Sequence, residues 1–265
     1  MSGGPSPLLD FFKKGEVPRD VRLLAAQGAL ETRALEQLAI LSLLVGDAEE
    51  EVRTTAESTL ARIPVDALRK FLGRSDVPSG LREFFAARGV IPDEIPVVEG
   101  DDPLVTAADG AAGANEEDDD EIGAEDEDQA TAAQRVQKMG FTQRLKAAVK
   151  GSREIRSLLI RDPNKMIAAA CLSSPKITEQ EVESIARMTN VSDDVLRIIG
   201  NNRGWTKNYS IVVGLVKNPK TPVAMSMNMM RRLNDRDLSL LSLDRNVPEP
   251  LRVAARKRVS SGGKE

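Results

Sequence analysis

The sequence predicts an all-α protein, an α-solenoid of stacked two-helix repeats that is interrupted by a disordered acidic linker. The main observation is a similar phrase that recurs every 28 residues, opening at Asp162, Asn190, Asn218 and Asn246. Apolar residues follow each opening with helical spacing, and no alternating run is long enough to indicate a sheet. A fixed period near this length is typical of helix pairs that are too small to fold alone and are stabilised by stacking.

The first helix of each repeat is expected directly after its opening Asn or Asp. Ser192 is a candidate N-cap, and the two acids that follow it favour the positive end of the helix dipole. Pro222 and Pro250 stand where helices tolerate proline, in the first turn. The residues five places after the openings share an apolar column, which holds Ile167, Val195, Val223 and Leu251.

The second helix is expected to begin about thirteen residues before the next opening. An apolar column precedes it, formed by Val149, Ile177, Trp205 and Leu233. Three candidate N-caps follow this column directly, namely Thr178, Thr206 and Asn234, and Thr178 forms a capping box with Glu181. The inward column holds Leu158, Ala186, Gly214 and Ser242, and its last three small residues would let neighbouring helices approach closely.

This pattern resembles the HEAT-like and leucine-rich-variant classes of α-helical repeat. The phrase Asn218-Pro219-Lys220-Thr221-Pro222 is the closest match to the opening of the leucine-rich variant. The resemblance covers the C-terminal half of the chain and implies a curved, right-handed solenoid that serves as a binding surface. It implies no chemistry, because one fold supports many functions.

The composition predicts three regions. Residues 1–92 should form a degenerate helical-repeat block with helices at 32–45 and 65–72, after a loose leader over residues 1–15. Residues 93–133 contain sixteen Asp and Glu and no Lys or Arg, so they should form a disordered acidic linker. Residues 134–265 should form the regular HEAT-like repeat block. Whether the two repeat blocks form one continuous solenoid is left open.

The charge is strongly divided between these regions. Residues 134–265 carry 25 Lys and Arg against 12 Asp and Glu, a net charge of +13 beside the −16 of the linker. One hypothesis is that the linker folds back on the basic block and competes with an anionic partner. The alternative is that it is only a flexible tether.

The sequence favours a cytoplasmic protein. No run approaches the roughly 18 apolar residues of a membrane span, and the N-terminus lacks the pattern of a signal peptide. The single cysteine, Cys171, excludes an internal disulfide framework.

The sequence also argues against catalysis. The chain has no histidine, which removes the commonest general base and metal ligand. Cys171 shares an apolar column and is expected in the core, and no glycine-rich phosphate loop is present. The acidic run 116–121 lacks the spacing and the turn glycine of a calcium loop. We therefore expect no enzyme activity, no cofactor and no metal site.

The candidate binding residues are cations in the turns between helices, together with one tyrosine. Stacking would align these turns along one edge, and the resulting row of cations could bind phosphates or acidic protein segments. The alternative is that each cation offsets a helix dipole. Tyr209 falls in a charged column and should face solvent, whereas Trp205 and the methionines of 225–230 should be core. The predicted partner-binding residues are Lys150, Lys176, Arg203, Lys207, Tyr209, Arg231 and Arg232.

The function expected from the sequence is a non-enzymatic scaffold or adaptor whose basic C-terminal repeats bind a protein with an acidic surface. The alternative is a nucleic-acid-binding repeat protein that uses the same edge, with the acidic linker as an internal competitor. DNA-base excision enzymes built from HEAT-like repeats, and repeat lyases that attach pigments to proteins, are similar in architecture only. The sequence does not predict the partner's identity or the oligomeric state.

Overall fold

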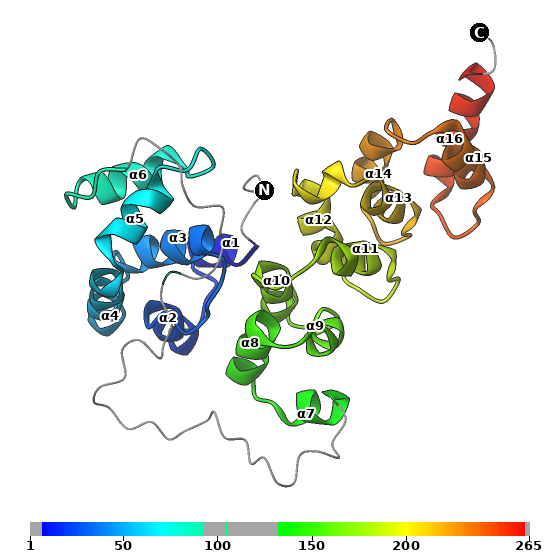
Figure 1. The fold of residues 1–265 in the computed structure, drawn as a ribbon. Coiled ribbons are helices and arrows are strands. Elements are labelled where there is room, and N and C mark those ends of the chain that lie inside the picture. The colour runs from blue at the N-terminus through cyan, green and yellow to red at the C-terminus, as the bar shows by residue number, and fades with distance from the viewer. Residues whose placement is uncertain (1–6, 93–103, 105–131, 263–265) are drawn as a thin grey trace. The chain divides into compact units, whose positions relative to one another are not determined.

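The protein is helical throughout the residues that its structure, a computed structural model, describes (Figure 1). These residues are 7–92, 104 and 132–262, and within them the chain forms sixteen α-helices and no strand. The predicted all-α class is therefore confirmed. Apart from residues 104, 132 and 133, the predicted acidic linker lies outside the described residues.

The chain divides into two compact units. The N-terminal unit comprises residues 6–159 and 166–176, and the C-terminal unit comprises residues 160–165 and 177–265. Residues 132–159 and 166–176 thus group with residues 7–92. The three regions expected from composition stay a prediction.

The N-terminal unit contains nine complete helices and most of a tenth. They are α1 (Pro7–Lys14), α2 (Arg19–Ala26), α3 (Ala34–Leu44), α4 (Glu50–Arg62), α5 (Val65–Leu72), α6 (Ser79–Ala86), α7 (Ala132–Lys138), α8 (Phe141–Lys150), α9 (Arg153–Leu159) and α10 (Lys165–Ser173). The helices expected over 32–45 and 65–72 are α3 and α5. The leader expected to be loose is instead largely helix α1, which forms because Leu8 is completely buried.

A buried carboxylate links three segments of the N-terminal unit. Glu36 of α3 is only 3% exposed, and its Oε1 accepts hydrogen bonds from the backbone N–H groups of Leu8 (2.8 Å) and Leu9 (3.3 Å) and from Ser173 Oγ (3.2 Å). Burial raises the pKa of Glu36 to about 7, although these hydrogen bonds and the charge of Arg33 favour the ionised form. Glu36 therefore caps α1 and fixes α10 to the N-terminal helices.

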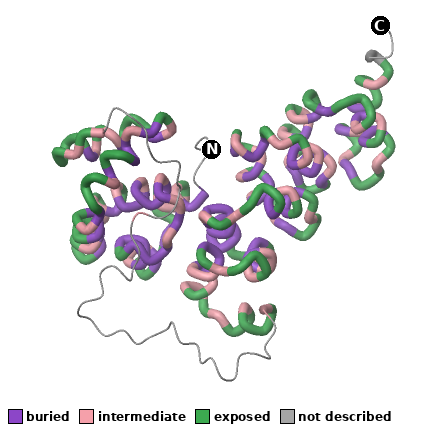
Figure 2. Tube along the Cα trace, viewed as in Figure 1, coloured by how far each residue is buried: buried purple, intermediate pink, exposed green. Residues whose placement is uncertain are grey.

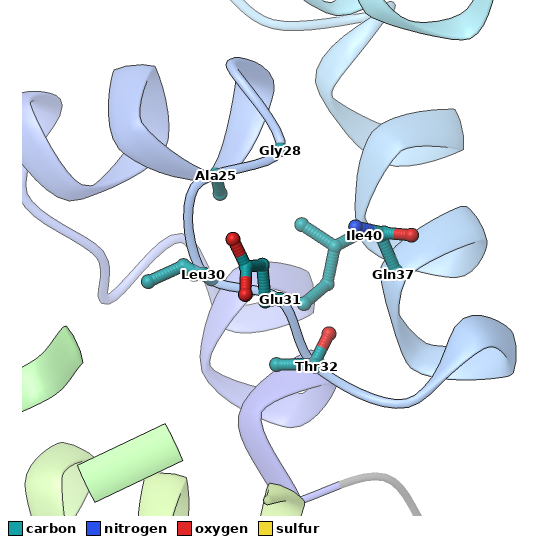
Figure 3. A pocket seen from close by; sticks show the side chains of 7 residues that line it. All are labelled: Ala25, Gly28, Leu30, Glu31, Thr32, Gln37 and Ile40. Atoms are coloured by element: carbon teal, nitrogen blue, oxygen red, sulfur yellow. The ribbon is translucent and has the colours of Figure 1, made fainter. Parts of the chain in front are cut away.

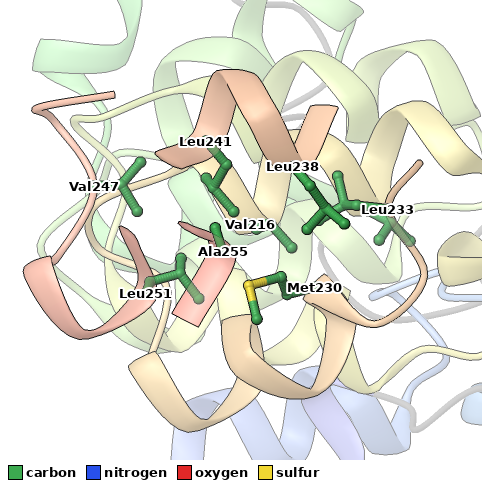
Figure 4. Close-up of a cluster of buried hydrophobic side chains, with 9 residues drawn as sticks. Val216, Met230, Leu233, Leu238, Leu241, Val247, Leu251 and Ala255 are labelled. Atoms are coloured by element: carbon green, nitrogen blue, oxygen red, sulfur yellow. The ribbon is translucent and has the colours of Figure 1, made fainter. Parts of the chain in front are cut away.

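The C-terminal unit contains six α-helices and one short 3-10 helix. They are α11 (Glu179–Arg187), α12 (Asp193–Asn201), η2 (Trp205–Lys207), α13 (Tyr209–Lys217), α14 (Val223–Met230), α15 (Asp235–Leu243) and α16 (Glu249–Gly262). Buried and exposed residues alternate along these helices, as amphipathic packing requires (Figure 2). Side chains of α13 to α16 and their connections form one apolar cluster (Figure 4). Trp205 is 7% exposed and Cys171, in the N-terminal unit, is fully buried, which confirms both as core residues.

The helix starts confirm most of the predicted caps. Thr178 forms the capping box with Glu181, Ser192 accepts the backbone N–H of Val195, and Asn234 accepts that of Asp237. Thr206 is the exception, because its hydroxyl donates to the Asn202 carbonyl at 2.9 Å inside the η2 turn. That turn delays the start of α13, and Asn208 caps the helix in place of Thr206.

The strict 28-residue period is not confirmed. Helices α10, α12, α14 and α16 begin at residues 165, 193, 223 and 249, so the successive intervals are 28, 30 and 26 residues. Asn218 is consequently the C-cap of α13, whereas Asn190 and Asn246 each lie two residues beyond a C-cap. The shift also corrects the apolar column. Val223 is the first residue of α14 and is 39% exposed, while Ile167, Val195 and Leu251 are buried.

Helices α11 and α13 pack closely at the small residues of the inward column. A Cβ atom at Gly214 would lie 3.3 Å from the Cβ of Ala186 and 3.2 Å from the Cγ of Arg187. Beside this contact, the amide of Asn218 donates to the carbonyl oxygens of Ala186 and Met188, both at 2.8 Å. The predicted close approach is therefore confirmed for Ala186 and Gly214, and a buried amide fastens the end of α11.

Candidate partner-binding edge

Hydrogen bonds to backbone carbonyl groups join neighbouring basic turns in the C-terminal unit. The turn between α12 and α13 carries Arg203 and Lys207, and the turn between α14 and α15 carries Arg231 and Arg232. Nη2 of Arg232 donates to the carbonyl oxygen of Thr206 at 2.5 Å, so these two turns lie side by side. Arg258 of α16 donates in the same way to the carbonyl oxygen of Arg231 at 3.5 Å. We call this set the basic edge, formed by Arg203, Lys207, Arg231, Arg232 and Arg258.

Three cations of the basic edge have no anionic neighbour. Arg203, Lys207 and Arg231 are exposed, and their side chains make no hydrogen bond or ion pair with any residue that the structure describes. Four other cations of the same unit differ, because each forms an ion pair with an acid. The pairs are Arg187 with Glu183 (2.6 Å), Arg197 with Asp193 (3.5 Å), Lys165 with Asp194 (2.7 Å) and Lys217 with Asp237 (3.1 Å).

The charge balance of this part of the chain is strongly positive. Residues 203–262 contain twelve Lys and Arg and four Asp and Glu. Two of those acids, Asp235 and Asp237, lie in the first turn of α15, where acids stabilise the helix N-terminus. The acids are therefore too few to neutralise the edge, which attracts anions over roughly a Debye length of 8–10 Å.

Tyr209 is part of the packing between α13 and α15. The residue is 39% exposed, as expected, but its hydroxyl donates to Asp237 Oδ2 at 2.6 Å and accepts the backbone N–H of Asn234 at 3.2 Å. The hydrogen bond from Tyr209, helped by Lys217, lowers the pKa of Asp237, and burial raises the pKa of Tyr209. Any contact of Tyr209 with a partner would therefore use the ring and not the hydroxyl.

Lys150 and Lys176 belong to the N-terminal unit, and the other five predicted residues belong to the C-terminal unit. Lys150 forms an ion pair with Glu31 at 2.7 Å. Lys176 Nζ donates to the carbonyl oxygen of Lys150 at 3.4 Å, and Arg156 donates to that of Lys176, also at 3.4 Å. Both lysines thus have structural contacts, and the turns that hold them are joined as the turns of the basic edge are.

Sequence reasoning missed two arginines that support these turns. Arg258 extends the basic edge onto α16, and the run Arg256-Lys257-Arg258 was the available signal. Arg156 is 6% exposed and donates to the carbonyl oxygen of Gly151 at 2.7 Å as well as to that of Lys176. No sequence signal marked Arg156, because a buried arginine on a short helix looks like a surface cation.

A small pocket between α2 and α3 offers little to a ligand (Figure 3). Its carboxylate, Glu31, already pairs with Lys150. The lining residues are Ala25, Gly28, Leu30, Glu31, Thr32, Gln37 and Ile40. Among the described residues, no three Cys, Asp or Glu side chains gather as metal ligands would, and every helix is too short or too polar to cross a membrane.

Comparison with known proteins adds no relative. No family model matches the chain, and no curated protein or solved structure matches it either. The resemblance to HEAT-like repeats therefore stays a prediction.

Proposed function

We propose that this protein is a non-enzymatic, cytoplasmic adaptor whose basic edge binds an acidic segment of a partner protein. The observation that carries the proposal is the set of three exposed cations, Arg203, Lys207 and Arg231, which have no anionic neighbour among the described residues. Arg232 holds their two turns together through the Thr206 carbonyl. Cations fixed on neighbouring turns recognise a row of carboxylates with little loss of backbone entropy.

On this proposal, helices α11 to α16 are successive two-helix repeats of a solenoid. Neighbour relations support it, since α11 packs on α13, α13 on α14, α14 on α16 and α15 on α16. The close contact at Gly214 supports it as well. Stacked pairs set equivalent turns beside one another, which is how an edge of like charge arises from separate repeats.

Nucleic acid is the second candidate ligand, and the excess of eight positive charges over residues 203–262 is the observation that favours it. Phosphate neutralisation alone gives micromolar affinity with a steep dependence on salt. We rank it second because the edge offers one partly exposed aromatic ring, Tyr209, where single-stranded ligands usually stack bases on several.

A matched pair of variants tests the proposal. The edge variant is Arg203→Gln, Lys207→Gln and Arg231→Gln, and the control is Lys165→Gln, Arg187→Gln and Arg197→Gln, which removes the same charge from ion-paired helix faces. Fluorescence anisotropy would measure the binding of two probes of about 20 units, poly-glutamate and single-stranded DNA. Three exposed contacts predict an affinity about tenfold lower in the edge variant than in the control.

Equal affinities of the two variants would refute the proposal. Tighter binding of DNA than of poly-glutamate, with a steep salt dependence, would support the nucleic-acid alternative instead. Deleting residues 95–129 tests the acidic linker as an internal competitor. The affinity for poly-glutamate should then rise at low salt, and an unchanged affinity would favour a simple tether.

A further inference from the structure

Three large apolar side chains are exposed on the last two helices of the C-terminal unit. Leu240 and Leu243 of α15 are 51% and 74% exposed, and Val253 of α16 is 54% exposed. Exposed apolar groups that gather in one place mark interaction sites, whereas single ones need no explanation.

Helix geometry puts the three residues on the same side of the α15–α16 pair. Leu238 and Leu241 of α15 point into the apolar cluster together with Leu251 and Ala255 of α16 (Figure 4). Leu240 stands two residues after Leu238, and Val253 stands two residues from both Leu251 and Ala255. Two residues correspond to about 200° around a helix, so these side chains point away from the cluster.

The two helices are antiparallel neighbours joined by residues 244–248, so Leu240 and Val253 lie at similar heights from that connection. Leu243 follows Leu240 by three residues and lies on the same helix face. We call this surface the end face, formed by Leu240, Leu243 and Val253.

The preceding helix pair shows what such a face contacts. Val253 is the fifth residue of α16, and the fifth residue of α14 is Met227. Met227 packs against the cluster to which α16 contributes Leu251 and Ala255. The outer side of one helix pair is thus covered by the next, and the end face is the corresponding side of the last pair.

The surrounding charges indicate the chemistry of that helix. Arg236 lies one turn before Leu240, and Arg256 and Lys257 lie one turn after Val253. Asp244 and Glu249 flank the α15–α16 connection, but Asp244 accepts the backbone N–H of Asn246 and Glu249 lies in the first turn of α16. Arg258, which donates to the Arg231 carbonyl as part of the basic edge, belongs to the same helix as Val253.

We propose that the end face binds an amphipathic helix with an acidic polar side, supplied by the partner protein of the basic edge. The leucines and Val253 would receive its apolar side, and the cations around them would receive its carboxylates. A second copy of the chain fits less well, since twelve cations against four acids over residues 203–262 would repel each other across the contact. This inference rests on the proposed function of the basic edge.

Two peptides and two variants test the end face in the full chain. The peptides are an amphipathic helix of about 20 residues, half leucine and half glutamate, and a poly-glutamate of about half that length, so that both carry the same charge. The end-face variant is Leu243→Ser and Val253→Ser. The control is Val65→Ser and Ile91→Ser, which removes exposed apolar groups from the N-terminal unit.

We expect the end-face variant to bind the amphipathic peptide about tenfold more weakly than the wild type does, and to bind poly-glutamate with unchanged affinity. The control variant should bind both peptides with unchanged affinity. An unchanged affinity for the amphipathic peptide would overturn the inference. The inference would also be overturned if the wild type and the control showed a mass that rises with concentration in sedimentation and the end-face variant did not. The end face would then bind a second copy of the chain. If only the edge variant loses binding, the proposed function stands and this inference fails. If the edge variant keeps full binding of both peptides, the proposed function fails.

Discussion

The buried carboxyl of Glu36 should make the stability of the N-terminal unit depend on pH, and Glu36→Gln should remove that dependence. Glutamine keeps a carbonyl oxygen that can accept the backbone N–H groups of Leu8 and Leu9 and the hydroxyl of Ser173. The substitution therefore removes the charge and leaves the hydrogen-bond acceptor in place.

The pKa of Glu36 sets both the sign and the size of the effect. It rises from 4.5 to about 7 in the folded protein, chiefly because burial disfavours the ionised carboxylate. The folded state therefore binds the proton more tightly than the unfolded state. The stabilisation is complete below pH 4.5 and is lost as the pH rises through about 7. A shift of this size corresponds to about 3 kcal/mol at 1.36 kcal/mol per pH unit.

Urea unfolding followed by far-UV circular dichroism would measure this effect. The free energy of unfolding of the wild-type chain, relative to Glu36→Gln, should fall by about 2–3 kcal/mol between pH 5 and pH 8. The fluorescence of Trp205, the single tryptophan, reports on the C-terminal unit and should show no such difference. Glu57→Gln, at an exposed position on α4, is the matched control.

A constant difference between wild type and Glu36→Gln at the two pH values would refute this reasoning. Glu36 would then ionise as easily in the folded protein as in the unfolded chain. If the free energy of unfolding of the wild type also falls with pH relative to Glu57→Gln, the effect comes from the net charge of the chain and not from the burial of Glu36.

Three further substitutions test the packing of the C-terminal unit. Gly214→Val should lower its stability by about 1–3 kcal/mol, because a Cβ there already meets Ala186 and Arg187; an unchanged unfolding midpoint of Trp205 fluorescence would contradict the close packing. Asn218→Ala should cost about 1–3 kcal/mol in the same assay, because two carbonyl groups at the end of α11 lose their donor, and Asn218→Asp should not restore it. Tyr209→Phe should raise the pKa of Asp237, as measured by NMR titration, because the carboxylate loses a hydrogen bond. It should also lower the stability by about 1 kcal/mol above pH 4, and by less in acid, where Asp237 becomes protonated. Its affinity for poly-glutamate should stay unchanged, and a clear loss would show that the hydroxyl serves binding.

The sequence predicted the features that depend on short-range patterns. The capping box at Thr178, the N-cap at Ser192 and the close contact at Gly214 follow from local hydrogen bonding and side-chain size, which sequence displays directly. The burial of Trp205 and Cys171 followed from their apolar columns.

The errors arose where tertiary structure changes the local register. The extra turn at Trp205–Lys207 delays α13, so Thr206 loses its expected role as a cap, and the same two-residue shift puts Val223 at an exposed helix start. A repeat analysis cannot detect this shift, because the residues added to one helical repeat are missing from the next and the 28-residue spacing of the sequence stays the same. Glu36 was missed because its partners lie 28 and 137 residues away in the chain.

Lysine labelling on the full chain would test the basic edge most directly. An amine-reactive ester, with mass spectrometry as the readout, would compare Lys207 on the edge with Lys220, which is also exposed and lies beyond the C-terminal end of α13. Saturating poly-glutamate should protect Lys207 and leave the labelling of Lys220 unchanged. Equal protection of both lysines, or of neither, would contradict a binding site built from the turns of the basic edge.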